Sequence, residues 1–109
     1  MRVVSRRLLQ EFWEQPGRRD SEQQLKTWFN VTRKAEWSSF EAVKKDYPSV
    51  DVAHGRYVFD IKGNTYRLIC SIDFVWHGVL TLWVGPHGEY DDLMRGDGRK
   101  LKRLFGETP

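Results

Sequence analysis

Two short segments of this 109-residue chain carry side chains suited to chemistry on a phosphodiester. Lys62 and Arg67 flank a Gly-Asn pair, and a guanidinium stays charged and planar, so it can bind a phosphate through two parallel hydrogen bonds. Further along, His87 lies three residues before Tyr90. A histidine gains or loses a proton near neutral pH, and a tyrosine can donate one. Two cations with a histidine and a tyrosine predict cleavage of RNA without a metal.

Such cleavage needs a base for the 2′-hydroxyl proton, positive charge for the phosphoryl oxygens and an acid for the leaving 5′-oxygen. Because the 2′-hydroxyl is the nucleophile, the predicted site acts on RNA and spares DNA. We assign the charge to Arg67 and Lys62, and the proton transfers to His87 and Tyr90. The residue types alone leave open which of His87 and Tyr90 is the acid and which is the base.

Each of these four residues also has an ordinary structural interpretation. Arg67 would pair across two strands with Asp60, a contact worth roughly 0.2–1 kcal/mol. Lys62 stands beside a tight turn, which is a common solvated position. His87 would serve only to shape a turn, and Tyr90 would anchor that turn to the core.

Other reactive side chains predict little chemistry. His54 and His77 fall in expected loops and are interpreted as surface histidines. Cys70 is the single cysteine, which excludes an internal disulfide, and it falls on the expected core side of a strand, where a thiol is inert. No repeated pair of metal ligands is present, and no Gly-Lys-Ser/Thr forms a phosphate loop. We therefore expect no metal and no cofactor.

The elements that position these residues follow from the hydrophobic period, which is helical in the first half of the chain. The first four residues are expected to form a strand, and Ser5 to cap the helix after it. Ser21 and Gln24 have the spacing of a capping box at the start of a second helix. Ser38 and Glu41 repeat that signal for a third, shorter helix.

From residue 57 onward the apolar residues alternate, which predicts strands. Gly63 and Asn64 form an expected two-residue hairpin loop, which pairs Asp60 with Arg67. This register puts Lys62 and Arg67 on one face of the sheet together with Asp60. The opposite, core-facing side then carries Tyr57, Phe59, Ile61, Tyr66, Leu68 and Cys70.

Helices followed by antiparallel strands predict an α+β fold, with N-terminal helices packed on one face of a small antiparallel sheet. A second hairpin is expected at residues 76–78, and a turn at residues 85–91 just past the last strand. No apolar run approaches the ~20 residues of a membrane span, and no signal-peptide core is present. With its lone cysteine, the protein is expected in the cytoplasm.

The net charge of +3 comes entirely from the end of the chain. Residues 1–94 contain 13 basic and 13 acidic residues, whereas residues 95–109 contain five basic and two acidic ones. We expect a folded domain over residues 1–94 and a basic, mobile tail over residues 95–109 with at most one amphipathic turn. Arg99 and Lys100 in that tail are expected to contact RNA, ribosomal RNA included, with an affinity that falls as salt rises. The alternative is that the tail is dispensable.

Two segments resemble the HigB-type toxins of bacterial type II toxin–antitoxin systems. The matching stretches are YVFDIKGNTYRLI at residues 57–69 and GPHGEYD at residues 85–91. The resemblance implies a RelE-like fold, ribosome-dependent cleavage of mRNA, and neutralisation by a HigA-like helix-turn-helix antitoxin. It adds Asn64 to the RNA-binding residues Lys62 and Arg67.

Two other functions stay open on the sequence alone. In the first, the same fold is a non-catalytic interaction module that binds an antitoxin and nucleic acid in a repressor complex. In the second, the chain is a small RNA-binding domain outside any toxin system. Analysis of RNA product ends separates the nuclease from both.

Overall fold

The alternating segment folds into antiparallel strands at the centre of a five-stranded sheet. The computed structural model describes residues 1–96 and 98–105. The strands lie in the order β1-β5-β4-β3-β2, and only the β1–β5 pair is parallel. Their bounds are β1 Arg2–Val4, β2 Asp51–Ala53, β3 Arg56–Ile61, β4 Tyr66–Asp73 and β5 Gly78–Pro86.

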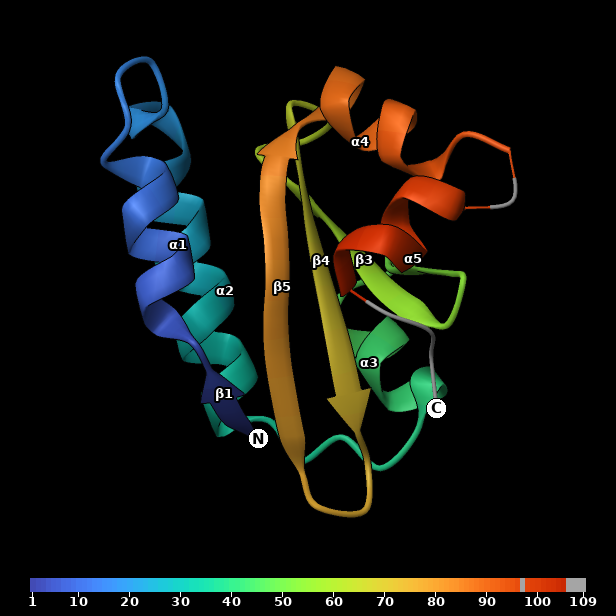
Figure 1. The fold of residues 1–109 in the computed structure, drawn as a ribbon. Helices are drawn as coiled ribbons and strands as arrows, with labels where there is room; N and C mark the ends of the chain where they lie inside the picture. Colours follow the sequence, from blue (N-terminus) through green and yellow to red (C-terminus); the bar gives the residue numbers. More distant parts are fainter. Residues whose placement is uncertain (97, 106–109) are drawn as a thin grey trace.

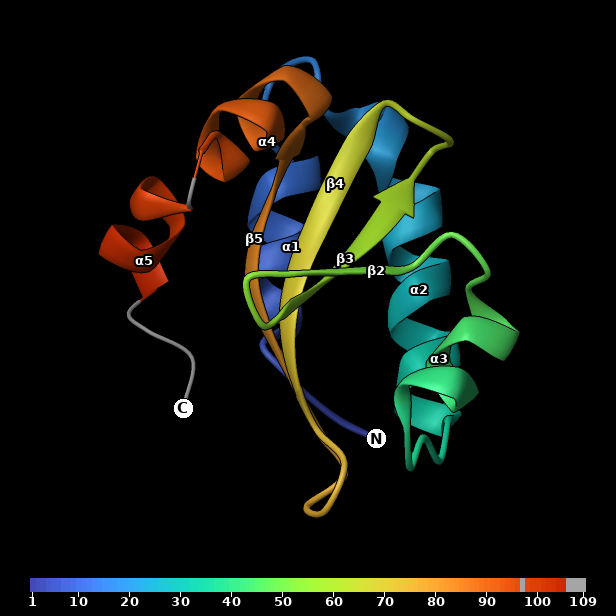
Figure 2. The same cartoon turned by 90° about the vertical axis from the view of Figure 1, so that its right-hand side faces the viewer.

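Helices lie on both sides of this sheet (Figures 1 and 2). The first three pack on one face, which confirms the α+β class and the predicted N-terminal helical layer. A second pair covers part of the other face, which the sequence analysis did not anticipate. The helices are α1 Arg6–Trp13, α2 Glu22–Lys34, α3 Phe40–Asp46, α4 His87–Met94 and α5 Arg99–Phe105, with a 3₁₀ turn over Arg19–Ser21. No described helix has the length and apolar character that crossing a membrane requires.

The main core lies between the sheet and α1–α3 and is rich in aromatic side chains. The ring of Phe59 lies 5.4 Å from Trp28, 5.2 Å from Tyr47 and 6.3 Å from Trp37, measured between centroids. Such contacts add to the free energy gained by burying the rings. The predicted core-facing side chains of β3 and β4 all face this layer. Cys70 is fully buried there, and burial raises the pKa of its thiol, as expected of an inert cysteine.

A smaller core lies on the opposite face of the sheet. Ile69 is fully buried against Leu93 of α4 and Leu101 of α5. Leu101 therefore packs α5 against the sheet. The segment after residue 94 thus contains a packed seven-residue helix, where at most one amphipathic turn was expected. The mobility of residues 95–109 and the division of the chain at residue 94 stay predictions.

A β-bulge in β5 keeps the main core continuous. Ile69 pairs with Trp83 and Cys70 with Thr81, so Leu82 is the extra residue between them. Without it, the period of two would turn the residues on either side of the bulge to opposite faces. With it, both Thr81 and Val84 are buried beneath the helical layer.

Replacing Thr81 by valine should destabilise the protein by about 1–3 kcal/mol. The Thr81 hydroxyl accepts a hydrogen bond from the Ser5 amide at 2.9 Å and donates one to the Ser5 carbonyl at 2.8 Å. Valine keeps the volume but leaves both backbone groups unpaired in a partly buried place. Urea unfolding measures the loss, and Thr81→Ser, which keeps the hydroxyl, should recover most of it. Equal stability of the valine and serine variants would contradict the assignment.

The predicted helix caps are only partly correct. Ser39, not Ser38, caps α3, and its Oγ accepts from the Ala42 amide at 3.3 Å. Ser5 occupies the N-cap position of α1, but its side chain makes no capping hydrogen bond. The capping box at Ser21 is absent, because the Ser21 hydroxyl donates to the Arg18 carbonyl instead.

Candidate functional site

The hairpin that carries the two predicted cations has a four-residue loop, not the two-residue loop expected. Ile61 pairs with Tyr66, and the Thr65 amide donates to the Lys62 carbonyl at 3.1 Å. Positive φ falls on Lys62 (54°) and Gly63 (62°), so Lys62 has already left the strand. The predicted register itself is confirmed, since Asp60 pairs with Arg67.

The loop turns Lys62 toward the helical layer. Its ammonium nitrogen lies 2.8 Å from Oδ2 of Asp20, and its backbone amide donates to the side chain of Gln24. Asp20 also accepts a hydrogen bond from the hydroxyl of Tyr66, whose ring belongs to the main core. Lys62 and Arg67 therefore do not share a face, and that prediction was wrong. The reason is a contact between residues 42 positions apart, which strand alternation does not reveal.

Replacing Asp20 by asparagine should lower the stability of the fold at neutral pH and lower it less at acid pH. Hydrogen bonds from Lys62 and then Tyr66 lower the pKa of the Asp20 carboxyl below 3.8. A lowered pKa stabilises the fold above the unfolded-state value, and this contribution is lost as the pH falls through the folded-state value. The difference in melting temperature between the wild type and Asp20→Asn should therefore shrink from about pH 6 to about pH 3. A constant difference would contradict this account.

Arg67 points to the other face and is held from several sides. Its Nε lies 3.2 Å from Oδ1 of Asp60, its Nη1 donates to the Tyr66 carbonyl at 3.4 Å, and its Nη2 donates to the Asn64 side chain. The guanidinium carbon lies 5.6 Å from the ring centre of Tyr90, a cation–π contact. These contacts engage three of the five guanidinium N–H donors, and 12% of the Arg67 side chain is exposed. Arg67 is thus a largely buried charge that its neighbours hold in place.

Of the segment predicted as a turn, residues 85–91, the first two end strand β5 and the rest begin helix α4. Pro86 is its N-cap residue in extended conformation, and His87 is the first helical residue. The His87 amide donates to the Thr65 carbonyl at 3.1 Å, which joins the start of α4 to the hairpin loop. Glu89 in the first turn suits the positive end of the helix dipole.

This helix places His87 and Tyr90 one turn apart on neighbouring positions of its surface. Nδ1 of His87 lies 3.3 Å from Oδ2 of Asp91, and 42% of the His87 side chain is exposed. A carboxylate on one ring nitrogen orients the imidazole and leaves Nε2 for a ligand. Burial, and next the charge of Asp51, raises the pKa of the Tyr90 hydroxyl. Tyr90 therefore keeps its proton at neutral pH.

The structure brings together Asn64, Arg67 and Tyr90 by direct contact, and His87 through the shared helix. It separates Lys62 from them, and Lys100 lies near the far end of α4, paired with Asp92 at 2.6 Å. Sequence reasoning did not assign roles to Asp20, which holds Lys62, or to Asp91, which holds His87. The spacing of His87 and Asp91, four residues apart, would have indicated their contact if a helix had been expected.

This arrangement can neutralise charge on a bound anion, accept a proton and donate one. The guanidinium, the imidazole and the phenol cover the three requirements of metal-free phosphodiester cleavage. Within residues 1–96 and 98–105, no group of three or more His, Cys, Asp or Glu side chains is placed to hold a metal ion. The histidines outside α4, at positions 54 and 77, lie in loops with positive φ.

Comparison with known proteins identifies the family. A model of the HigB toxins, described as the RelE-like toxic component of a toxin–antitoxin system, matches residues 21–93. The mRNA interferase HigB of Escherichia coli O6:H1 is 31% identical over 74 residues, which cover 65% of this chain and 72% of that protein. The match to the family model includes the hairpin and most of α4 and ends before α5. The chain belongs to the HigB family of RelE-like toxins.

Proposed function

We propose that this protein is an endoribonuclease toxin that cleaves mRNA by attack of the 2′-hydroxyl on the adjacent phosphate, without a metal. The observation that carries the proposal is the position of Arg67 over the ring of Tyr90, on the helix that begins with His87. Membership of the HigB family and the name of the Escherichia coli relative, an mRNA interferase, support the same activity.

In the proposed reaction, Nε2 of His87 takes the proton from the 2′-hydroxyl, and the oxygen attacks phosphorus. The bond between phosphorus and the 5′-oxygen breaks, and the Tyr90 hydroxyl donates the proton that the leaving oxygen needs. Arg67 binds the non-bridging oxygens, whose charge grows in the transition state. The products are a 2′,3′-cyclic phosphate and a 5′-hydroxyl.

The remaining predicted residues have supporting roles in this proposal. Asn64 and Asp60 hold the guanidinium of Arg67 before RNA arrives, so little reorganisation is needed during the reaction. Asp91 is a positioning residue for His87. Lys62 is assigned a contact to the RNA backbone and no part in the chemical step, because Asp20 holds it toward the helical layer.

The proposed partners follow from the family. A toxin of a toxin–antitoxin system requires an antitoxin, which we propose to be a HigA-like helix-turn-helix protein. The proposed substrate is mRNA on the ribosome, which places the action in the cytoplasm. A non-catalytic module would instead bind RNA and antitoxin and leave RNA intact.

Brief induction of the chain in bacteria tests the proposal. We expect growth to stop and new RNA 5′ ends to accumulate within coding sequences, mapped by 5′-end sequencing. Co-expression of a cognate HigA-like antitoxin should restore growth. Unchanged growth with intact mRNA, in cells shown to contain folded protein, would reject the nuclease function.

A further inference from the structure

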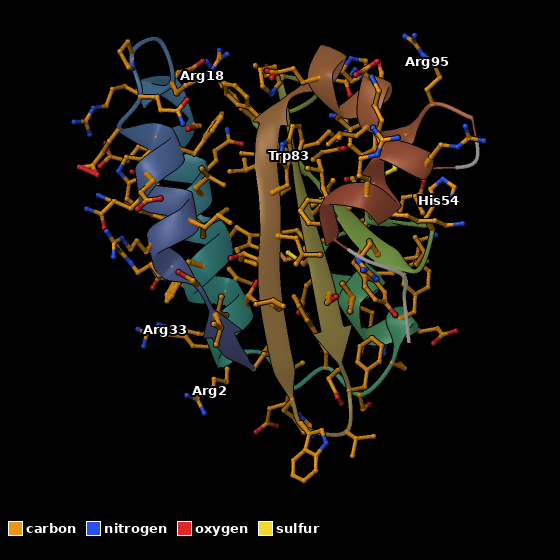
Figure 3. All side chains as sticks on the ribbon, viewed as in Figure 1. Arg2, Arg18, Arg33, His54, Trp83 and Arg95 are labelled. Atoms are coloured by element: carbon orange, nitrogen blue, oxygen red, sulfur yellow. The ribbon has the colours of Figure 1, made fainter. Side chains whose placement is uncertain are left out.

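A basic groove lies between α4 and α5, near the far end of α4 from His87. Its hollow, about 560 Å³ in volume, is lined by Asp92, Arg95, Gly96, Arg99, Lys100 and Arg103. Figure 3 shows Arg95 at the end of α4, on the opposite side of the molecule from Arg2 and Arg33. We call this surface, with its four cations and one carboxylate, the α4–α5 groove.

Cations outnumber carboxylates among the described residues that line the groove. Asp92 lies 2.6 Å from the Lys100 ammonium and 3.9 Å from the Arg95 guanidinium. The hydrogen bond from Lys100 holds the pKa of Asp92 below its usual value, so this carboxylate is ionised. Among the described lining residues, four side chains are positively charged and one is negatively charged. Because residues 1–94 are balanced, the groove concentrates the basic character of the chain.

The cations of the groove are carried on a helix that is attached to the sheet. Leu101 is buried against Ile69 and Leu93. Arg56, itself buried at the start of β3, donates to the Phe105 carbonyl at 3.3 Å and so satisfies a backbone group near the end of α5. At the other end, a Cβ on Gly98 would lie 2.7 Å from the ring of His54, so α5 begins in close contact with the loop before β3. The attachment fixes the position of helix α5, which carries Arg99, Lys100 and Arg103.

We propose that the α4–α5 groove binds the phosphate backbone of RNA next to the cleaved nucleotide. This inference rests on the proposed function, and it gives the nuclease a second binding site. Arginines in a fixed array suit phosphates because each guanidinium makes paired hydrogen bonds. Helix α4 runs from His87 to Met94, about 10 Å along its axis, which corresponds to about three stacked nucleotides. RNA bound at His87 therefore reaches the groove within a few phosphates.

The test measures RNA affinity against salt in the Arg67→Ala background, where cleavage is expected to be slow. Arg95, Arg99 and Arg103 are replaced together by glutamine. Three lost phosphate contacts should reduce the slope of log K against log salt by about two for a single-stranded oligonucleotide. The matched control replaces three exposed lysines by glutamine, Lys34 of α2 and Lys44 and Lys45 of α3. This control should leave the slope unchanged. Circular dichroism confirms that both variants fold.

A second arm separates the two sources of RNA. The same variants are sedimented with ribosomes that carry no mRNA. A reduced salt slope for the oligonucleotide assigns the groove to the substrate strand and supports the proposal, whether or not ribosome binding also weakens. Weakened binding to empty ribosomes with an unchanged slope for the oligonucleotide assigns the groove to ribosomal RNA and overturns the proposal. An unchanged slope together with unchanged ribosome binding likewise overturns it. Because cleavage is not measured here, failure of the nuclease proposal would appear separately, as intact RNA with the wild-type chain.

Discussion

Replacing Arg67 by alanine is expected to lower the rate of RNA cleavage by about a hundred- to a thousandfold and to relieve toxicity. The guanidinium is held by Asp60, Asn64 and the ring of Tyr90, so its remaining donors meet the phosphate already oriented. Charge that is placed in advance stabilises the transition state without reorganisation. The measurement is single-turnover cleavage of an RNA oligonucleotide or of mRNA on ribosomes, alongside growth after induction.

Two controls separate this role from the ordinary cross-strand pair. Losing the pair with Asp60 and the contact with Tyr90 should cost at most about 2 kcal/mol of stability, which leaves the fold intact. Asp60→Asn removes the ion pair but keeps the guanidinium, so cleavage should fall by no more than about tenfold, well short of the loss in Arg67→Ala. Equal loss of activity in the two variants would assign Arg67 to the sheet and not to the reaction. Continued killing by a folded Arg67→Ala variant would remove it from the mechanism.

Replacing His87 by glutamine is expected to lower cleavage by about a hundred- to ten-thousandfold, the usual contribution of a positioned acid or base. Glutamine keeps a polar side chain of similar reach but does not exchange a proton near neutral pH. A general base makes the wild-type rate rise with pH through an acid limb, and this limb should disappear in the variant. The measurement is the pH profile of single-turnover cleavage for both proteins.

Variants of the residues next to His87 distinguish its role from theirs. Tyr90→Phe keeps the ring beneath Arg67 but removes the proton donor, so it should slow cleavage while leaving the acid limb in place. Asp91→Asn removes the charge that orients the imidazole and should have a smaller effect. His77→Asn, in the exposed β4–β5 turn, is the control and should cleave at the wild-type rate. An acid limb that persists in His87→Gln would assign the base to another group.

The parts of the fold that were predicted correctly depend on local patterns. Alternation around the Gly-Asn pair was enough to pair Asp60 with Arg67 and to place Cys70 in the core. It did not give the loop length, because Lys62 adopts a left-handed conformation that its residue type does not favour. The turn of Lys62 toward Asp20 depends on a contact distant in sequence, so no local signal shows it.

Helix α4 was missed for a related reason. The run Pro-His-Gly has turn-like composition, and Gly88 lowers the helix propensity of the segment. Burial of Leu93 against Ile69 outweighs that propensity, since helices in proteins are stabilised mainly by packing. The second core is built around Ile69, on the face of β4 opposite the main core. An isoleucine at that position does not by itself indicate that helices cover this face. The α4–α5 groove was therefore not predictable as a surface, although two of its cations, Arg99 and Lys100, were expected to contact RNA.

The most direct test of the central claim is the chemistry of the RNA ends. An oligonucleotide spanning a mapped cleavage site is incubated with the purified protein, on ribosomes where they are required, and the products are identified by mass spectrometry. Attack by the neighbouring hydroxyl predicts a 2′,3′-cyclic phosphate and a 5′-hydroxyl, and complete resistance of a substrate with a single 2′-deoxy nucleotide before the cleaved bond. Cleavage of that deoxy substrate, or products with 5′-phosphate ends, would contradict the assignment of Arg67, His87 and Tyr90 to one metal-free site.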